Sequence, residues 1–184
     1  MASLSEKWRP TTWEAFIGQE KAVKRARAIL GRSGFDGGAF YISGPPGTGK
    51  SSLALLIARE CCDDFDIIKL DGEACTIDAV REAAKLMPYG TLSGCFRAWI
   101  VDECQAMSAR AVQAWLTVLE PLAKNTIVIF TTTAESADLF GEYASPFRSR
   151  GVSSDFTNQG LAKPFAKRLK EIAVAEGLDG RDES

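Results

Sequence analysis

Residues 44–51 restrict the possible folds of this chain more than any other segment. They read Gly-Pro-Pro-Gly-Thr-Gly-Lys-Ser and match the pattern G-x-x-x-x-G-K-[ST] at every fixed position. An apolar run at 39–42 precedes them and predicts a buried strand, and the run 52–58 that follows predicts a helix. In this setting glycines let successive N–H groups point at one anion, and the helix start adds its positive dipole end. Lys50 can then reach the β- and γ-phosphates and the Ser51 hydroxyl can bind Mg²⁺, so the chain is predicted to bind a nucleoside triphosphate.

The bulk composition excludes several other classes of protein. The 184 residues are 46% hydrophobic, enough for one substantial core with a small appendage. The chain has no histidine, which removes Ser-His and Cys-His catalysis. Its five cysteines are irregularly spaced, which argues against a zinc site or a disulfide framework and favours reduced, mostly buried thiols. No apolar stretch approaches membrane-spanning length, so we expect no membrane association and a cytoplasmic location.

Short apolar runs alternate with helical patterns along the chain. The further predicted strands are 66–70, 97–101, 126–131 and 152–156. The predicted helices are 19–30, 77–86, 109–119, 161–175 and, more weakly, 135–143. This order predicts an α/β fold, a five-stranded and mainly parallel sheet with helices on both faces, whose ligands bind beyond the carboxyl ends of the strands. Residues 1–12 have no period and are expected to be extended, and the helix from 161 opens a different element beyond the sheet.

The strand at 97–101 ends in two carboxylates, Asp102 and Glu103. A parallel sheet delivers both to the edge where the phosphate-binding loop lies. Asp102 can hold Mg²⁺, and Glu103 can orient and deprotonate the attacking water. An acidic pair alone is equally typical of a capped loop. The matched phosphate-binding loop favours the catalytic interpretation.

Three further features leave alternatives open. A hydroxyl among Thr131, Thr132 and Thr133 can touch the γ-phosphate or the lytic water, or these residues simply fill a strand end. Arg148 and Arg150 precede the last strand and suit the charge on a transferring phosphoryl group, or are exposed loop arginines. The basic stretch 7–32 fits a nucleic-acid surface as well as a solvated helix face.

Together these segments resemble the AAA+ ATPase subunits of sliding-clamp loaders over nearly the whole chain. Residues 7–10 and 17–20 are similar to that family's adenine-enclosing N-terminal box, and 44–51 and 102–103 to its Walker A and Walker B motifs. Thr132 aligns with sensor 1, and Ser149-Arg150-Gly151 resembles the family's Ser-Arg-Cys motif. Residues 172–173 and 176–178 resemble the first helix of its lid.

The resemblance implies a division of labour among the residues. ATP and Mg²⁺ are the implied cofactors, and residues 1–157 and 158–184 are the implied nucleotide-binding domain and the beginning of a helical lid. The implied nucleotide-binding residues are Trp8, Arg9, Pro10, Ile17, Gly44, Pro46, Gly47, Thr48, Gly49, Lys50, Ser51 and Ser52. Ser51 and Asp102 hold the metal, Lys50, Glu103 and Thr132 act in hydrolysis, and Arg150 acts in trans on a neighbour's γ-phosphate.

The resemblance also implies partners. Several subunits form an open ring or spiral, a pentamer at full length, which uses ATP to open the sliding clamp and load it on primer–template DNA. Hydrolysis then releases the closed clamp. Such a protein works at the chromosome, in the nucleoid of the cytoplasm or in a nucleus.

The chain departs from the family at three places. Gly151 stands where a Cys is usual, and Cys104-Gln105 follows the acidic pair where Ala-Asp or x-His is commoner. The chain also stops at Ser184, within the expected lid, so we expect a fragment or truncated product with weak activity in isolation. The lack of a zinc module favours replication factor C small subunits and phage clamp loaders over the bacterial gamma/tau subunits.

Three other functions compete with the clamp loader. A helicase loader or branch-migration motor would share both Walker motifs, but not the N-terminal box or Ser149-Arg150. A non-hydrolysing scaffold subunit would not need Lys50, Asp102 and Glu103. A small-molecule kinase with a phosphate-binding loop would need an acceptor-binding lid, and the sequence offers none.

Overall fold

The computed structural model describes residues 3–91, 95–133 and 144–178. Its strands are β1 (Gly37–Ser43), β2 (Ile67–Asp71), β3 (Arg97–Asp102), β4 (Thr126–Thr132) and β5 (Val152–Asp155). Its α-helices are α1 (Leu4–Lys7), α2 (Glu20–Leu30), α3 (Lys50–Cys61), α4 (Ile77–Leu86), α5 (Ala109–Leu119), α6 (Ala144–Ser149) and α7 (Ala162–Ala175). Short 3-10 helices η1 (Asp64–Asp66) and η2 (Cys104–Ala106) precede β2 and follow β3. The strands form one sheet in the order β2-β3-β4-β1-β5, and every pairing in it is parallel, which confirms the predicted fold class.

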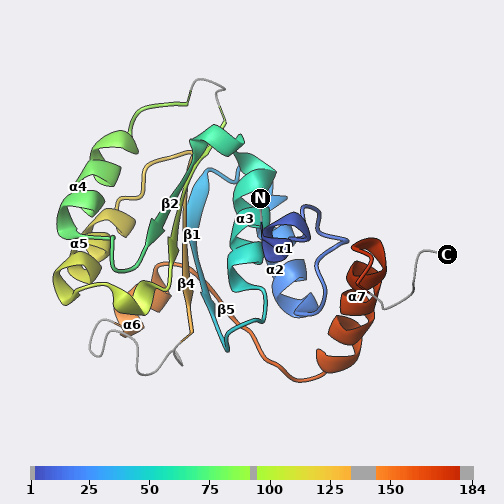
Figure 1. Cartoon of the computed structure of the whole chain (residues 1–184). Helices are drawn as coiled ribbons and strands as arrows, with labels where there is room; N and C mark the ends of the chain where they lie inside the picture. The colour runs from blue at the N-terminus through green and yellow to red at the C-terminus, as the bar shows by residue number, and fades with distance from the viewer. Residues whose placement is uncertain (1–2, 92–94, 134–143, 179–184) are drawn as a thin grey trace.

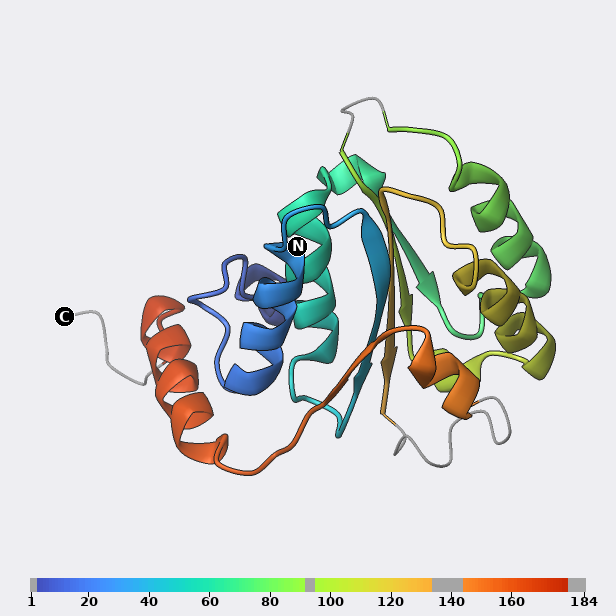
Figure 2. The same cartoon turned by 180° about the vertical axis from the view of Figure 1, so that it is seen from behind.

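Helices cover both faces of this sheet (Figure 1, Figure 2). Helices α2 and α3 lie on one face and α4 and α5 on the other, while α7 lies beyond α2 at the edge of the molecule. Side chains alternate along β1 between the two faces: Ala39 and Tyr41 join the core under α4 and α5, and Phe40 and Ile42 join the core under α2 and α3. Because both faces are buried, the strands read as continuous apolar runs. No helix in the described ranges is both long and apolar enough to cross a bilayer.

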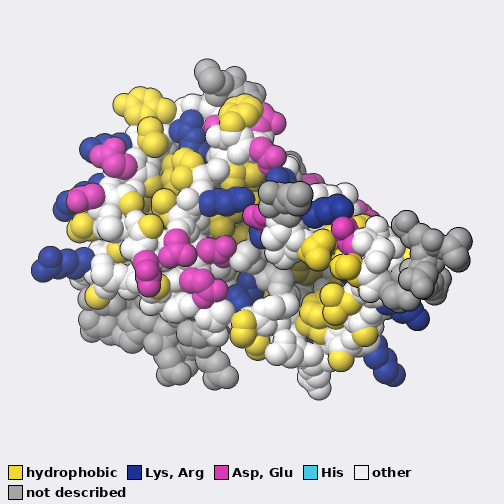
Figure 3. Space-filling view, in the orientation of Figure 1, with side chains coloured by type: hydrophobic (Ala, Val, Ile, Leu, Met, Phe, Trp, Pro, Cys, Tyr) yellow, Lys and Arg dark blue, Asp and Glu magenta, His cyan; other side chains and the backbone are white. Residues whose placement is uncertain are grey.

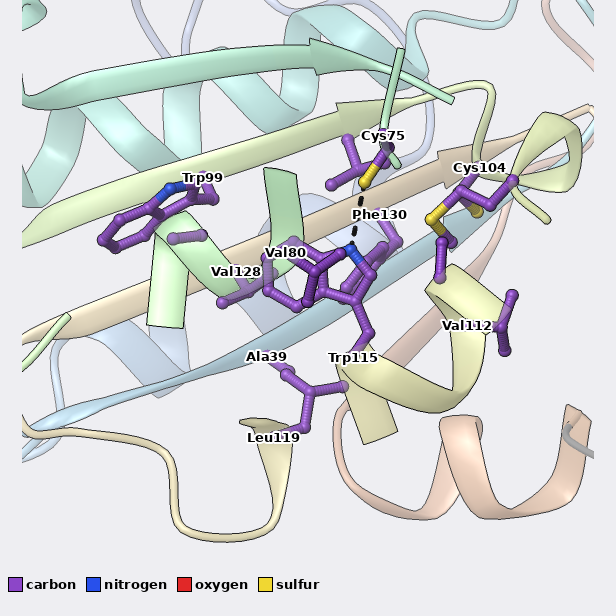
Figure 4. Packing of buried hydrophobic residues seen from close by; sticks show 14 of the residues in the cluster. Ala39, Cys75, Val80, Trp99, Cys104, Val112, Trp115, Leu119, Val128 and Phe130 are labelled. Atoms are coloured by element: carbon purple, nitrogen blue, oxygen red, sulfur yellow. Dashed lines mark hydrogen bonds between the residues drawn. The ribbon is translucent and has the colours of Figure 1, made fainter. Parts of the chain in front are cut away.

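Trp115 of α5 organises the core under α4 and α5 (Figure 4). Its ring meets Phe130 of β4 edge to face, with ring centroids 5.3 Å apart. A buried indole N–H needs a hydrogen-bond partner, and Trp115 Nε1 donates to Cys75 Sγ at 3.1 Å. Burial raises the pKa of the Cys75 thiol. This contact fastens the segment between β2 and α4 to α5.

One local prediction was wrong. Residues 1–12 are not wholly extended, because α1 forms behind a capping box in which Ser3 Oγ accepts from the Glu6 N–H and Glu6 Oε2 accepts from the Ser3 N–H, both at 3.3 Å. Of the two arginines before β5, Arg148 belongs to α6, and Arg150 lies in the turn that follows its last residue. The predicted weak helix at 135–143 lies outside the described residues.

Gly151 is explained by the close approach of β5 to β1. A Cβ at this position would lie 2.9 Å from the carbonyl oxygen of Ala39 and 3.2 Å from its Cβ. We therefore expect Gly151→Ala to lower the free energy of unfolding by about 1–3 kcal/mol, since the side chain forces two strands apart. Thermal or urea unfolding measures this directly, with Gly90→Ala as control, because a Cβ there meets open space. Equal stability of the two variants would contradict the packing explanation.

Candidate active site

The phosphate-binding loop connects β1 to α3 at the carboxyl edge of the sheet. Gly44 and Gly49 have φ angles of 143° and 96°, which side chains rarely tolerate. A Cβ on Gly44 would also lie 2.6 Å from the carbonyl oxygen of Phe156. Thr48 Oγ1 donates to the carbonyl of Pro45 at 2.8 Å and closes the loop on itself. Pro46 and Gly47 form its exposed tip.

Lys50 lies inside this loop. Its ammonium donates to the carbonyl oxygens of Gly44 and Pro45, both at 2.9 Å, and the residue is only 6% exposed. Burial lowers its pKa from the ordinary lysine value, and the nearby carboxylates of Glu103 and Asp102 oppose that shift. A buried cation that touches only backbone dipoles suits an anionic ligand in the same loop.

Ser51 and Asp102 meet at the start of α3. Ser51 Oγ donates to Asp102 Oδ1 at 2.9 Å, and Thr131 Oγ1 donates to the same carboxylate oxygen. A hydroxyl and a carboxylate beside a phosphate-binding loop are the oxygen ligands that Mg²⁺ takes when phosphates and water complete its shell. The two residues predicted to hold the metal are thus brought together, and their chemistry fits Mg²⁺.

Glu103 lies next to this pair, at φ 50°, a left-handed conformation that is costly for a residue with a side chain. Its Oε2 accepts from Thr133 Oγ1 at 3.0 Å and from Gln105 Nε2. Thr132 is fully buried, and its hydroxyl donates to Gln105 Oε1 at 2.7 Å. The hydroxyls of the three threonines at the end of β4 therefore donate, in chain order, to Asp102, Gln105 and Glu103. Acidic side chains gather over the carboxyl ends of β2 and β3 on the face shown in Figure 3.

A pocket of about 160 Å³ adjoins the phosphate-binding loop. Hydrophobic side chains gather over α1, α2 and the near edge of α7 on the same face (Figure 3). The pocket is lined by Trp8, Pro10, Ala15, Phe16, Ile17, Gly47, Thr48, Gly49, Ser52, Phe165 and Arg168. Three of the four residues predicted to enclose the base line this pocket. The fourth, Arg9, is not among the lining residues, and its N–H donates to the Glu6 carbonyl at 3.3 Å.

Helix α7 closes the outer side of this pocket. Glu176 follows the helix, and its Oε1 accepts from Trp8 Nε1 and pairs with Lys7 Nζ, each at 2.6 Å. The hydrogen bonds from Lys7 and Trp8 lower the pKa of Glu176. The guanidinium of Arg168 lies 5.4 Å from the centre of the Trp8 ring, within the range of a cation–π contact. The N-terminal segment and α7, far apart in sequence, thus hold each other across the pocket.

Arg150 lies away from the loop of its own chain. The neighbouring Gly151 abuts Ala39 of β1, and Ala39 lies five positions before Gly44, where the phosphate-binding loop begins. At about 3.3 Å per residue of strand, the backbone beside Arg150 is therefore about 16 Å from the start of that loop. Its guanidinium donates to the carbonyl of Pro146 at 2.9 Å and lies 3.5 Å from Glu120 Oε1. Arg148 instead pairs with Asp155 at 3.6 Å.

Comparison with known proteins assigns the chain to a family. The AAA ATPase domain family matches residues 15–176, which is most of the chain. The chain belongs to the AAA ATPase family. ATPase activity and nucleotide binding follow from that membership in general terms, and the lysine and acidic pair described above are the parts that such an activity needs.

Two curated relatives of this chain are replication factor C small subunits. The chain is 29% identical over 187 residues to the replication factor C small subunit 1 of Pyrobaculum arsenaticum, with 97% of this chain and 54% of the relative covered. It is 31% identical over 186 residues to the replication factor C small subunit of Thermofilum pendens, with 94% of this chain and 53% of the relative covered. The chain therefore spans about half the length of these curated relatives.

Solved structures support the fold. The RuvB Holliday junction branch migration motor of Thermotoga maritima superposes with a TM-score of 0.66 at 24% identity, over 91% of this chain and 55% of that one. A DNA polymerase III gamma subunit-related protein of Thermotoga maritima superposes with a TM-score of 0.61 at 19% identity, over 90% of this chain and 55% of that one. At these identities the likeness establishes the AAA+ fold alone.

Sequence reasoning missed several residues of the site. Phe165 and Arg168 reach the pocket from α7, and Phe16 and Ala15 reach it from the segment before α2. The signal for Phe16 was present, since a large apolar residue stands just before the predicted Ile17. Nothing local pointed to α7, because its contact with the pocket depends on the path of the chain after β5.

Proposed function

We propose that this chain is an ATP-binding and ATP-hydrolysing subunit of a sliding-clamp loader, which uses ATP to open the clamp and load it on primer–template DNA during replication. The observation that carries the proposal is the match to replication factor C small subunits over 97% of the chain, well beyond the phosphate-binding loop and the acidic pair. A non-hydrolysing scaffold role is disfavoured, because Lys50, Asp102 and Glu103 are all present and gathered at one edge of the sheet.

The proposed roles follow from position. Lys50 neutralises the β- and γ-phosphates, and the backbone N–H groups of residues 44–51 bind the phosphate oxygens. Mg²⁺, held by Ser51 and Asp102, would supply charge neutralisation on the phosphates. Glu103 orients the attacking water and accepts its proton. Thr132 is proposed to sense the γ-phosphate or the water.

The adenine is proposed to lie in the pocket beside Trp8, Pro10 and Ile17. The pocket is apolar and adjoins the loop at Gly47 and Gly49, so a base placed there leaves its phosphates at Lys50. The lining residue Ser52 supplies a polar group on the first turn of α3. Arg9 is proposed to assist adenine binding from outside the set of residues that line the pocket.

Residues 1–157 are proposed to form the nucleotide-binding domain, and residues 158–184 the beginning of the helical lid. Phe156 is buried in the core, whereas α7 contributes no buried residue. Leu169 and Val174 of α7 are 65% and 49% exposed, apolar surface that further lid helices would cover. The lid would then respond to nucleotide through Arg168 and the Trp8–Glu176 contact.

The proposed partners are other loader subunits in a ring, the sliding clamp and primer–template DNA, at the chromosome in the cytoplasm. The experiment compares the ATPase rate of the chain alone, with primed DNA plus the sliding clamp, and with a four-way DNA junction. Stimulation by clamp and primed DNA supports the loader. Stimulation by the junction alone would favour a branch-migration motor such as RuvB.

Nucleotide binding is tested by Lys50→Ala. We expect ATP affinity to fall by about 100-fold or more, because charge-assisted hydrogen bonds to phosphate are lost from a buried loop. Titration of a fluorescent ATP analogue measures the affinity. Lys21→Ala, on the exposed face of α2, is the matched control. Equal affinities of the two variants would exclude the proposed phosphate site.

A further inference from the structure

Gln105 connects Glu103, which follows β3, to the threonines at the end of β4. Its Oε1 accepts from Thr132 Oγ1 at 2.7 Å, and its Nε2 donates to Thr133 Oγ1 at 2.9 Å and to Glu103 Oε2. Thr133 Oγ1 in turn donates to the same Glu103 oxygen at 3.0 Å. Gln105, Thr133 and the carboxylate thus form a closed triangle, and the buried Thr132 anchors it from behind.

Only one orientation of the Gln105 amide satisfies this network. Both N–H groups are used, one toward Glu103 and one toward Thr133, while the amide oxygen receives the Thr132 hydroxyl. The reversed amide would place its oxygen against the Glu103 carboxylate, so two acceptors would face each other. The negative charge on Glu103 therefore selects the amide orientation, and the amide in turn restricts rotation of the carboxylate.

The bonds that the described residues make to the Glu103 carboxylate converge on Oε2. Oε1 is then the oxygen left to take a proton from water. Glu103 is also held in a left-handed backbone conformation, stabilised by the bond from its N–H to Thr131 Oγ1 at 3.4 Å. Both the backbone and the side chain of this residue are tied to the end of β4.

We propose that Gln105 is a positioning residue, which holds the Glu103 carboxylate in the orientation needed to activate water and couples that orientation to Thr132 and Thr133. The inference rests on the proposed function of Glu103 in ATP hydrolysis. Thr132 then acts on the reaction through Gln105, and Thr133 acts by direct contact with the base. Gln105 donates no bond to the phosphate-binding loop in the network described above, so its role concerns the chemical step and not nucleotide affinity.

The first experiment separates binding from chemistry with Gln105→Leu, which keeps the bulk of the side chain and removes its hydrogen bonds. We expect ATP affinity to stay within about twofold and single-turnover hydrolysis to fall by about 10- to 100-fold, the effect of a misplaced reacting group. Gln159→Leu is the matched control, because Gln159 is an exposed glutamine before α7. A loss of ATP affinity, or hydrolysis equal to that of the control, would overturn the inference.

A double-mutant cycle tests whether Gln105 acts through Glu103. If it does, Gln105→Leu added to Glu103→Gln changes the residual rate by less than about twofold, since the base it positions is already removed. A merely structural role would instead give losses that multiply. Multiplying losses would therefore contradict the proposal.

The amide itself provides a readout that needs no hydrolysis. In the nucleotide-free chain, the side-chain N–H signals of Gln105 in a ¹H–¹⁵N spectrum should be displaced from those of Gln159 because its amide is hydrogen-bonded, and Glu103→Ala should move them toward the positions of the Gln159 signals. Signals that already coincide with those of Gln159 in the unsubstituted chain would overturn the proposal. A chain that hydrolyses no ATP would contradict the proposed function and with it the role of Gln105. Normal hydrolysis with an unchanged Gln105→Leu rate would contradict this inference alone.

Discussion

Glu103→Gln is expected to retain ATP affinity within about twofold and to lose about 10²- to 10⁴-fold in hydrolysis rate, the usual contribution of a general base. The amide has nearly the same shape as the carboxylate, and its oxygen can still accept the hydrogen bonds from Gln105 and Thr133. What disappears is the basic oxygen that is proposed to take the proton from water. Lys50, Ser51 and the loop backbone, which are proposed to bind the phosphates, are untouched.

The measurement pairs equilibrium ATP binding with single-turnover hydrolysis on the same protein. Glu73→Gln is the control, because Glu73 is an exposed acid in the neighbouring segment after β2. Its substitution removes the same charge from the same end of the sheet. Normal turnover by Glu103→Gln would remove Glu103 from the role of base. Loss of hydrolysis in both variants would instead indicate a general electrostatic effect.

Strong local patterns explain how much of this molecule was predictable. The phosphate-binding loop, the five parallel strands and the acidic pair after β3 each depend on short-range rules, namely glycine positions, apolar runs and the way parallel strands share an edge. Once those rules place Gly44 and Asp102 at one edge, the meeting of Ser51 with Asp102 follows from topology. The relatives confirm the resemblance to replication factor C small subunits that the motifs indicated.

Predictions failed or fell short where an element is too short to show a period or where distant segments decide the outcome. The capping box of α1 was readable at Ser3 and Glu6, but its short length gave no helical period. The partners of Thr131, Thr132 and Thr133 depend on which way each side chain points after a buried strand. That direction is set by the register of β4 in the sheet, where Thr131 and Thr132 lie opposite Ile42 and Ser43 of β1, and not by the threonines themselves. Arg168 reaches the pocket beside the phosphate-binding loop only because α7 lies beside the end of α1, a contact between segments separated by most of the chain.

Arg150→Ala is expected to leave ATP binding by the single chain unchanged and to lower hydrolysis in an assembled ring by about 10³-fold or more, the usual contribution of an arginine finger. The backbone beside Arg150 is about 16 Å from the start of its own phosphate-binding loop by the strand spacing given above, and the guanidinium is held by Pro146 and Glu120 instead. Its contact with Glu120 is long, at 3.5 Å, and the Glu120 side chain is 73% exposed. Such a pair is worth about 1 kcal/mol or less, so exchanging Glu120 for a neighbour's phosphate costs little.

Mixed rings distinguish action in trans from action in cis. A ring in which only one subunit carries Arg150→Ala should lose hydrolysis at the neighbouring subunit's nucleotide, while the altered subunit still hydrolyses its own when its other neighbour is intact. Arg148→Ala is the matched control, because that arginine pairs with Asp155 within its own chain and its loss should change the rate only slightly. If Arg150→Ala abolished ATP binding by the single chain, or left hydrolysis by the ring at the level of Arg148→Ala, Arg150 would have a structural role within its own subunit instead.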